Sequence, residues 1–189
     1  MAPPQKRSAA TGKPIVLIDE SGFMLQPTVR RTWAPEGKTP VSRAWDRHDR
    51  WSVLSALTVS PARRRVGLLF DVWPCNVGAA AVLAMLRTLR KRYPGGFLLA
   101  LDRWSVHRSA VRQLLERSDG RVEVEWLPAY APELNPVEQV WQRAKHVDLA
   151  NFVPEQAEHL RRAVEASLVK TRGQQAILRS CFAYAKLKL

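Results

Sequence analysis

The chain has 189 residues, 46% of them hydrophobic and 25% charged, and this composition fits one globular domain with a single sizeable core. The 30 Lys and Arg residues outnumber the 17 Asp and Glu residues to give a net charge of +13, which indicates a polyanionic partner such as nucleic acid. Two widely spaced cysteines exclude a disulfide scaffold and a zinc ribbon, and the apolar runs are too short for a membrane span or signal peptide, so we expect a cytoplasmic protein.

The first half of the chain is predicted to form an arm followed by three strands. Residues 1–13 mix Pro, Lys, Arg, Ser, Ala and Gly without periodicity, which predicts a flexible basic arm before a domain over residues 14–189. β-branched and aromatic runs then predict strands over residues 15–18, 51–59 and 66–73. The first of these strands delivers Asp19 at or near its end, and a turn over residues 33–41 precedes the second. Three consecutive strands imply an antiparallel meander.

The second half of the chain alternates helices with strands. Helices are predicted over residues 79–92 and 105–117, from near Val137, and over residues 154–182 with an interruption near Gly173, and strands over residues 97–101 and 122–127. A strand, a helix and a second strand in succession add parallel strands to the sheet. The predicted class is therefore α/β, with a mixed five-stranded sheet of three antiparallel strands plus parallel additions, flanked by helices. This element order is that of the ribonuclease H-like fold.

Acidic residues gather in one segment of this basic chain. Residues 101–138 hold five bases and seven acids, whereas every other segment of comparable length has an excess of bases. A protein that only holds phosphates has no need of such a cluster, but a metal-dependent nuclease needs carboxylates to capture divalent cations beside its DNA. A solvated loop with incidental acids is the alternative explanation.

Three acids occupy positions suited to such a site. Asp19 and Asp102 follow the first and fourth predicted strands, and Glu138 begins the helix after the fifth. The strings around them are DESGF at 19–23, RTWAPEGK at 31–38, LD at 101–102 followed by His107, and LPAYAPELNPVEQVW at 127–141. Together they resemble the catalytic domain of the DDE transposases of the mariner superfamily over residues 14–185. The similarity is greatest to their bacterial insertion-sequence branch, the insertion sequence 630 type, and the 35 residues between Asp102 and Glu138 match the short spacing of that superfamily.

The resemblance implies an activity and a set of site residues. It implies a metal-dependent endonuclease and strand transferase that binds two Mg²⁺ or Mn²⁺ ions, with Asp19 bridging them and Asp102 and Glu138 each completing one. Two ions about 3.5–4 Å apart can activate water and stabilise the leaving oxygen of a phosphodiester. Mg²⁺ prefers hard oxygen ligands and keeps several waters, so few carboxylates are needed.

The sequence also departs from the family pattern. Arg103 and Trp104 follow Asp102, where the family usually has Asn and a small residue. Ala131 stands where the family usually has Ser, in the loop over residues 128–136. Full-length family members carry helix-turn-helix modules ahead of the catalytic domain, and thirteen residues cannot hold them. The resemblance therefore predicts a homodimer on DNA or a partner polypeptide that supplies those modules, in a bacterial cytoplasm at the nucleoid.

Each candidate ligand has a rival explanation. Asn135, Pro136 and Glu138 also fit a helix N-terminus in which Glu138 closes a capping box, a device that stabilises by ~1 kcal/mol. Glu20 and Glu133 are neighbouring carboxylates that could be the ligand in place of Asp19 or Glu138.

Several basic residues are candidates for DNA binding, namely Arg63, Arg64, Arg65, Arg103, His107 and Lys145. The arginine run could follow a DNA backbone or could be a solvated loop. His107, five residues after Asp102, could approach the scissile phosphate or only begin a helix. Lys145 lies seven residues after Glu138, on nearly the same helical face, and is a candidate phosphate contact.

Three functions remain open on the sequence alone. The first is a transposase catalytic domain that hydrolyses DNA at element ends and joins the 3′ hydroxyl to target DNA. The second is a non-catalytic DNA-binding protein, a decayed or split transposase fragment. The third is another ribonuclease H-like nuclease that acts on RNA or branched DNA. Metal-dependent nicking separates the first from the second, and hybrid and branched substrates separate it from the third.

Overall fold

The fold is a five-stranded mixed sheet covered by helices on both faces. It was obtained as a computed structural model, which describes residues 4–41, 43–44, 49–116, 120–129, 131–185 and 187. The strands are β1 (Ile15–Met24), β2 (Arg50–Val59), β3 (Val66–Trp73), β4 (Phe97–Leu101) and β5 (Val122–Trp126), in the spatial order β3-β2-β1-β4-β5. β1, β2 and β3 pair antiparallel, whereas β4 and β5 add in parallel, as the sequence predicts.

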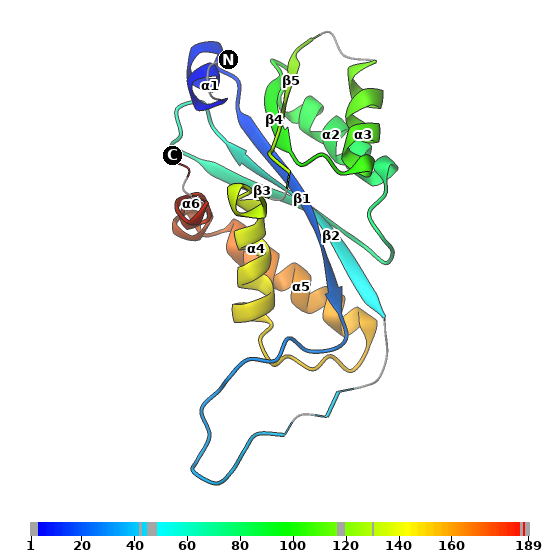
Figure 1. Ribbon diagram of the computed structural model, residues 1–189, viewed down its shortest axis with the longest axis vertical. Helices are drawn as coiled ribbons and strands as arrows, with labels where there is room; N and C mark the ends of the chain where they lie inside the picture. The colour runs from blue at the N-terminus through cyan, green and yellow to red at the C-terminus, as the bar shows by residue number, and fades with distance from the viewer. Residues whose placement is uncertain are drawn as a thin grey trace.

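Helices α2 (Ala79–Arg92) and α3 (Ser105–Leu115) cover one face of the sheet, and helices α4 (Val137–Arg143), α5 (Ala157–Arg172) and α6 (Gln175–Tyr184) cover the other (Figure 1). Alternate residues of a strand point to opposite faces. In β1, Val16 and Ile18 accordingly pack toward α2 and α3, while Leu17 packs toward α4 and α6. This alternation later decides which carboxylate faces which helix.

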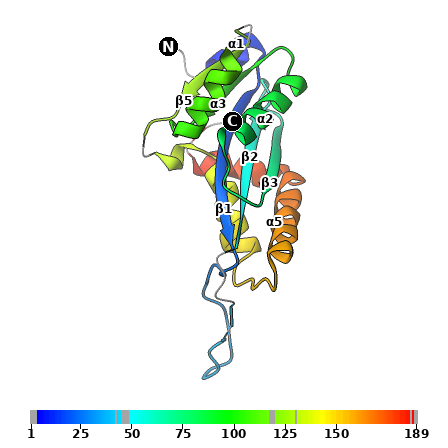
Figure 2. The same cartoon turned by 90° about the vertical axis from the view of Figure 1, so that its right-hand side faces the viewer.

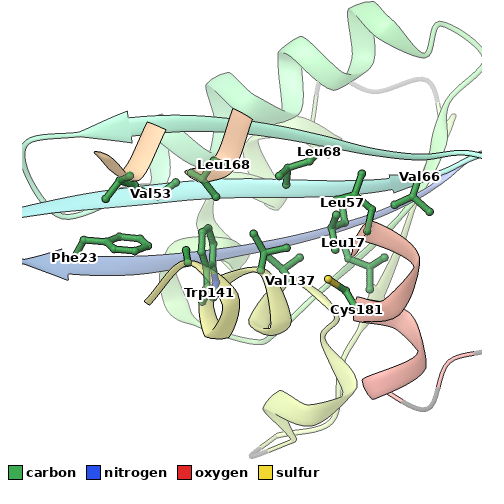
Figure 3. Close-up of a cluster of buried hydrophobic side chains, with 14 of the residues drawn as sticks. Leu17, Phe23, Val53, Leu57, Val66, Leu68, Val137, Trp141, Leu168 and Cys181 are labelled. Carbon is green, nitrogen blue, oxygen red and sulfur yellow. The ribbon is translucent and has the colours of Figure 1, made fainter. Parts of the chain in front are cut away.

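The core on the α4–α6 side packs helix α4 against strand β1. Figure 3 shows Trp141 of α4 against Phe23 of β1, with ring centroids 6.2 Å apart and rings nearly perpendicular. Val137, one turn earlier on α4, packs into the same cluster as Leu17 and Leu57. Burial of these apolar side chains fixes α4 on the sheet, and α4 carries Glu138 in its first turn.

Most element boundaries that differ from the prediction do so by one to three residues, and the end of β1 differs by six. β1 runs on to Met24, so Asp19 lies in the middle of this strand and not at its end. The predicted helix over residues 105–117 ends at Leu115 in the described part of the chain, and Arg117 lies outside the described residues. The break predicted near Gly173 is confirmed by the gap between α5 and α6.

The prediction of an arm without regular structure over residues 1–13 is wrong for helix α1 (Pro4–Thr11). Arg7 places Nη2 2.6 Å from Oε2 of Glu125, and Lys13 places Nζ 2.8 Å from Oε1 of Glu123. Both carboxylates belong to β5. Arg7 and Lys13 therefore form ion pairs with acids of the acidic segment over residues 101–138.

The first part of the connection between β1 and β2, residues 25–41, extends away from the sheet (Figures 1 and 2). It touches the body through a parallel bridge between Thr28 and Ala150 and through the Arg30 amide, which donates to Oδ1 of Asn151 at 2.8 Å. Its side chains include a fully exposed Trp33.

None of the helices in the described part of the chain combines the length and the hydrophobicity that a membrane span requires.

Candidate active site

The candidate site lies where the parallel part of the sheet stops. β1 and β4 pair in register from Ile15 with Leu98 to Leu17 with Ala100. Asp19 and Asp102 each lie two residues beyond this last pair, Asp19 within β1 and Asp102 directly after β4. Parallel pairing ends here because β4 finishes at Leu101, whereas β1 continues alongside β2. The sheet thus opens a gap at the level of these two carboxylates.

A cavity of about 640 Å³ occupies this gap. Its lining includes all three predicted ligands, the neighbouring acid, and two of the residues that depart from the family pattern: Asp19, Glu20, Asp102, Glu138, Arg103 and Trp104. The loop from Leu127 to Asn135 forms the remaining wall. Tyr130 of that loop lies outside the described residues.

Asp19 is the most deeply placed of the acids, with only 9% of the residue exposed. Its Oδ2 accepts a hydrogen bond of 3.0 Å from the indole nitrogen of Trp141. Burial, followed by repulsion from Glu138 and Glu20, raises the pKa of Asp19 to about 8, and the Trp141 bond only partly opposes this. The site is therefore short of positive charge around its innermost carboxylate.

Glu138 enters the cavity from the first turn of α4, and the capping-box explanation for it is wrong. In a capping box the glutamate would accept the amide hydrogen of Asn135. That amide instead donates to the carbonyl of Pro132 at 2.9 Å. Asn135 does satisfy a helix amide, because its Oδ1 accepts from the Val137 amide at 3.2 Å, but α4 begins at Val137 and its N-cap residue is Pro136, one residue later than predicted.

Asn135 also ties α4 to the sheet beside the site. Its side-chain nitrogen donates to the carbonyl of Ile18 at 3.2 Å, directly before Asp19. Burial raises the pKa of Glu138, and the positive charge of the Lys145 ammonium, seven residues later, opposes that rise. Glu138 is thus a half-buried carboxylate held over the end of the parallel ladder.

The two adjacent acids of β1 face opposite sides of the sheet. Asp19 follows the orientation of Leu17 and meets Trp141 on α4, while Glu20 follows that of Ile18 and meets His107 on α3. The strand alternation therefore separates Asp19 from its neighbour and places it on the same side as Glu138. Sequence analysis alone left these two acids as rivals.

His107 is fully buried, so the prediction that it contacts DNA is wrong for the folded chain. Its Nδ1 lies 2.5 Å from Oδ1 of Asp102, and its Nε2 lies 3.0 Å from Oε2 of Glu20. The contact between Nε2 and Glu20 lacks the geometry of a hydrogen bond, and it is an ion pair when the imidazole is protonated. Burial lowers the pKa of His107, but Glu20 and Asp102 outweigh burial and raise it.

The other basic candidates lie at different distances from the cavity. Arg103 is exposed and lines it. Lys145 is near the acids, but its Nζ donates to Oγ of Ser21 at 2.7 Å and stacks 5.3 Å from the Phe23 ring centroid. Burial lowers the pKa of Lys145 against the opposing pull of Glu138 and Asp19.

The arginine run is not part of the cavity lining. Residues 63–65 connect β2 to β3 after Val59, which pairs with Ile15, the first residue of β1 and four residues before Asp19. Arg63 adopts a left-handed backbone, with φ 55°, and its Nη2 donates to the carbonyl of Gln5 at 3.3 Å. Arg64 and Arg65 are exposed. Only these two are placed to meet a ligand freely.

Trp141 and the Glu20–His107 contact are the site features that the sequence analysis missed. Trp141 is a buried core residue that also donates a hydrogen bond to Asp19. Its position three residues after Glu138 puts both on one face of α4, which was the available signal. No comparable sequence signal links Glu20 to His107, because they lie 87 residues apart on different elements.

Comparison with known proteins identifies the family. The sequence profile described as DDE superfamily endonuclease matches residues 14–161, most of the chain. The chain belongs to this family. No curated protein matches it significantly.

Solved structures of the Mos1 mariner transposase share the fold of this DDE family member. The Mos1 mariner paired-end complex with Mn superposes with a TM-score of 0.65 at 16% identity, over 97% of this chain and 59% of that one. The Mos1 strand transfer complex gives 0.65 at 18%, over 96% and 54%. The paired-end complex with Mg gives 0.63 at 16%, over 97% and 60%. The predicted ribonuclease H-like class is thereby confirmed, and the chain spans little more than half the length of these transposase chains.

Proposed function

We propose that this chain is the catalytic domain of a DNA transposase of the bacterial insertion-sequence type. Its reaction would be hydrolysis of DNA at element ends followed by joining of the 3′ hydroxyl to target DNA. One observation carries the proposal: in a member of an endonuclease family, Asp19, Asp102 and Glu138 come from three separate elements and line one cavity. The Mos1 structures with Mn and Mg lend support from the same fold.

The residues of the cavity fit divalent metal ions. Carboxylate oxygens are the ligands that Mg²⁺ and Mn²⁺ prefer. Burial raises the pKa values of Asp19 and Glu138, repulsion between the neighbouring carboxylates adds to the rise, and a bound cation would oppose both effects. In the described part of the chain, no three acidic, His or Cys side chains stand close enough together to form a complete ligand set.

Each residue then has a defined task. Asp19, Asp102 and Glu138 would hold two ions, and those ions would supply activation of water and stabilisation of the leaving oxygen. Trp141 fixes the Asp19 carboxylate by its indole hydrogen bond. Arg103, exposed beside the acids, is positioned to pair with a phosphate of the bound strand.

DNA binding, a homodimer on DNA or a partner with helix-turn-helix modules, and a nucleoid location in a bacterial cytoplasm belong to the same proposal. The net charge of +13 supports DNA as the partner.

The decisive experiment is a nicking and strand-transfer assay on duplexes that carry the element ends. We expect cleavage with Mg²⁺ or Mn²⁺ and none in EDTA. DNA binding without cleavage would favour the split-fragment alternative. Faster cutting of RNA–DNA hybrids or branched DNA than of the duplex ends would favour another ribonuclease H-like nuclease.

Replacement of Glu138 with Gln should remove cleavage, because the amide keeps the shape but loses the anionic ligand. Glu133→Gln is the matched control: it makes the same change at an exposed carboxylate five residues earlier and should cleave like wild type. The measurement is the nicking rate at saturating Mg²⁺. Activity retained in Glu138→Gln but lost in Glu133→Gln would exchange the roles of these two acids.

DNA binding should weaken by orders of magnitude between ~50 and ~200 mM salt, because each neutralised phosphate contributes roughly −0.9 to the slope of log affinity against log salt. The double variant Arg64→Ala/Arg65→Ala should flatten that slope if the run contacts the backbone; Arg63 is left in place because it anchors α1. Arg87→Ala/Lys91→Ala on α2 removes the same charge elsewhere. Equal slopes for the two double variants would assign the arginine run to solvent.

A further inference from the structure

A buried imidazole joins two walls of the candidate active site. His107, on the first turn of α3, has no exposed surface, yet both of its ring nitrogens face carboxylates. Nδ1 contacts Asp102 at 2.5 Å and Nε2 contacts Glu20 at 3.0 Å. A buried polar ring needs partners for its nitrogens, and here both partners are acids that line the cavity. This one links α3 to the central strand β1 through two acidic residues of the cavity.

Two contacts hold the Oδ1 oxygen of the Asp102 carboxylate, and neither of them involves Oδ2. Oδ1 accepts from His107 and also from the Trp104 amide at 3.0 Å. For Oδ2, no hydrogen-bond donor is found within the described residues. The Asp102 side chain is 52% exposed and lines the cavity. The carboxylate is therefore oriented by its inner oxygen, with its outer oxygen available to a ligand.

The indole of Trp104 packs against this arrangement. Its ring meets the His107 ring edge to face, with centroids 5.5 Å apart at 88°. The backbone of Trp104 donates to Asp102 while its side chain covers the imidazole that also holds Asp102. The Trp that departs from the family pattern thus contributes to holding the acid in one orientation.

We propose that His107 is a positioning residue that holds Asp102 through Oδ1, so that Oδ2 is presented to the metal ion, and that Glu20 anchors the imidazole and is not itself a ligand. This inference rests on the proposed function. Carboxylates that bind metal are commonly oriented by such outer hydrogen bonds, and their loss typically costs about 10- to 100-fold in metal affinity. The alternative is that His107 merely stabilises the start of α3.

Two amide substitutions separate these roles. In His107→Asn the side-chain nitrogen can take the place of Nδ1 and still donate to Asp102, whereas in His107→Gln it reaches the place of Nε2 and meets Glu20. We expect His107→Asn and Glu20→Gln to bind Mn²⁺ within a few fold of wild type, and His107→Gln to bind it about 10- to 100-fold more weakly. The measurement is free Mn²⁺ by electron paramagnetic resonance, with thermal unfolding in EDTA as the check on the fold.

The outcomes separate the inference from the proposed function. Equal Mn²⁺ affinities for His107→Asn and His107→Gln, or a large loss in Glu20→Gln, would overturn the inference. Absence of Mn²⁺ binding by the wild-type chain would overturn the proposed function instead.

A second measurement needs only the wild-type fold. In ¹H–¹⁵N spectra of the imidazole rings, Mg²⁺ should shift the His107 signals and leave those of the exposed His159 unchanged. Identical responses of the two rings in a chain that binds Mn²⁺ would contradict the positioning role, whatever the folding of the variants.

Discussion

Asp19→Asn and Asp102→Asn should each abolish metal-dependent cleavage while leaving the fold and DNA affinity nearly intact. The amide preserves the shape of the side chain and removes the charge that binds the ions. Ions in such sites contribute several kcal/mol of transition-state stabilisation, and each 1.36 kcal/mol is a factor of ten, so we expect a loss of roughly 10³-fold or more. The measurement is the single-turnover nicking rate at saturating Mg²⁺.

The two aspartate variants differ in what else they disturb. The amide in Asp19→Asn can still accept the Trp141 hydrogen bond, and its burial becomes easier without the charge. Asp102→Asn can keep its oxygen toward His107 and the Trp104 amide. Binding of a duplex at low salt should therefore match wild type. Wild-type cleavage by either purified variant would remove that residue from the ligand set.

Local sequence patterns predicted the succession of strands along the chain, because the preference of a short run of residues for a strand is a short-range effect. β-branched runs predicted β2 to within one residue and β3 with its observed bounds, and the apolar run before Asp102 predicted β4. The end of β1 could not be predicted in this way. It continues past Asp19 because β2 pairs with it along its whole length, and that pairing is a long-range contact.

The carboxylates were predictable, but their surroundings were not. Asp19, Asp102 and Glu138 stand at recognisable positions in the sequence and do line one cavity. The capping box failed because the Asn135 amide bonds Pro132 in the preceding turn, a detail of loop geometry that the residue types do not specify. The burial of His107 likewise depends on how α3 packs against β1, which no window of sequence contains.

Helix α1 is another element that local sequence patterns did not predict. Its residues carry no apolar periodicity, and the N-terminal segment is joined to β5 by the ion pairs of Arg7 and Lys13 with Glu123 and Glu125. The net charge of +13 already counts these pairs. Arg7 and Lys13 are therefore bound to the chain's own acids and are not free to contact DNA phosphates.

The ion-free chain should lose stability as the pH rises toward 8, and Asp19→Asn should remove much of that loss. Burial, with Glu138 and Glu20, raises the pKa of Asp19 from 3.8 to about 8 in the folded chain. In the unfolded chain its pKa is near the ordinary value of about 3.9. Between these values the folded chain binds more protons than the unfolded one, so the free energy of unfolding falls with rising pH.

In EDTA, Asp19→Asn should therefore melt above wild type at pH 8.5, and the difference should shrink as the pH approaches ~4. A gain of even ~2 kcal/mol corresponds to about 4–8 °C for a chain of this size. Glu133→Gln, which removes one exposed charge, should melt like wild type throughout. Saturating Mg²⁺ should raise the melting temperature of wild type at pH 8.5 and raise that of Asp19→Asn much less, because an ion bound by Asp19 supplies the positive charge that this buried carboxylate lacks. An Asp19→Asn variant that melts below wild type in EDTA at pH 8.5 would show that the aspartate is compensated within the fold, and a cation would then not be needed to explain its burial.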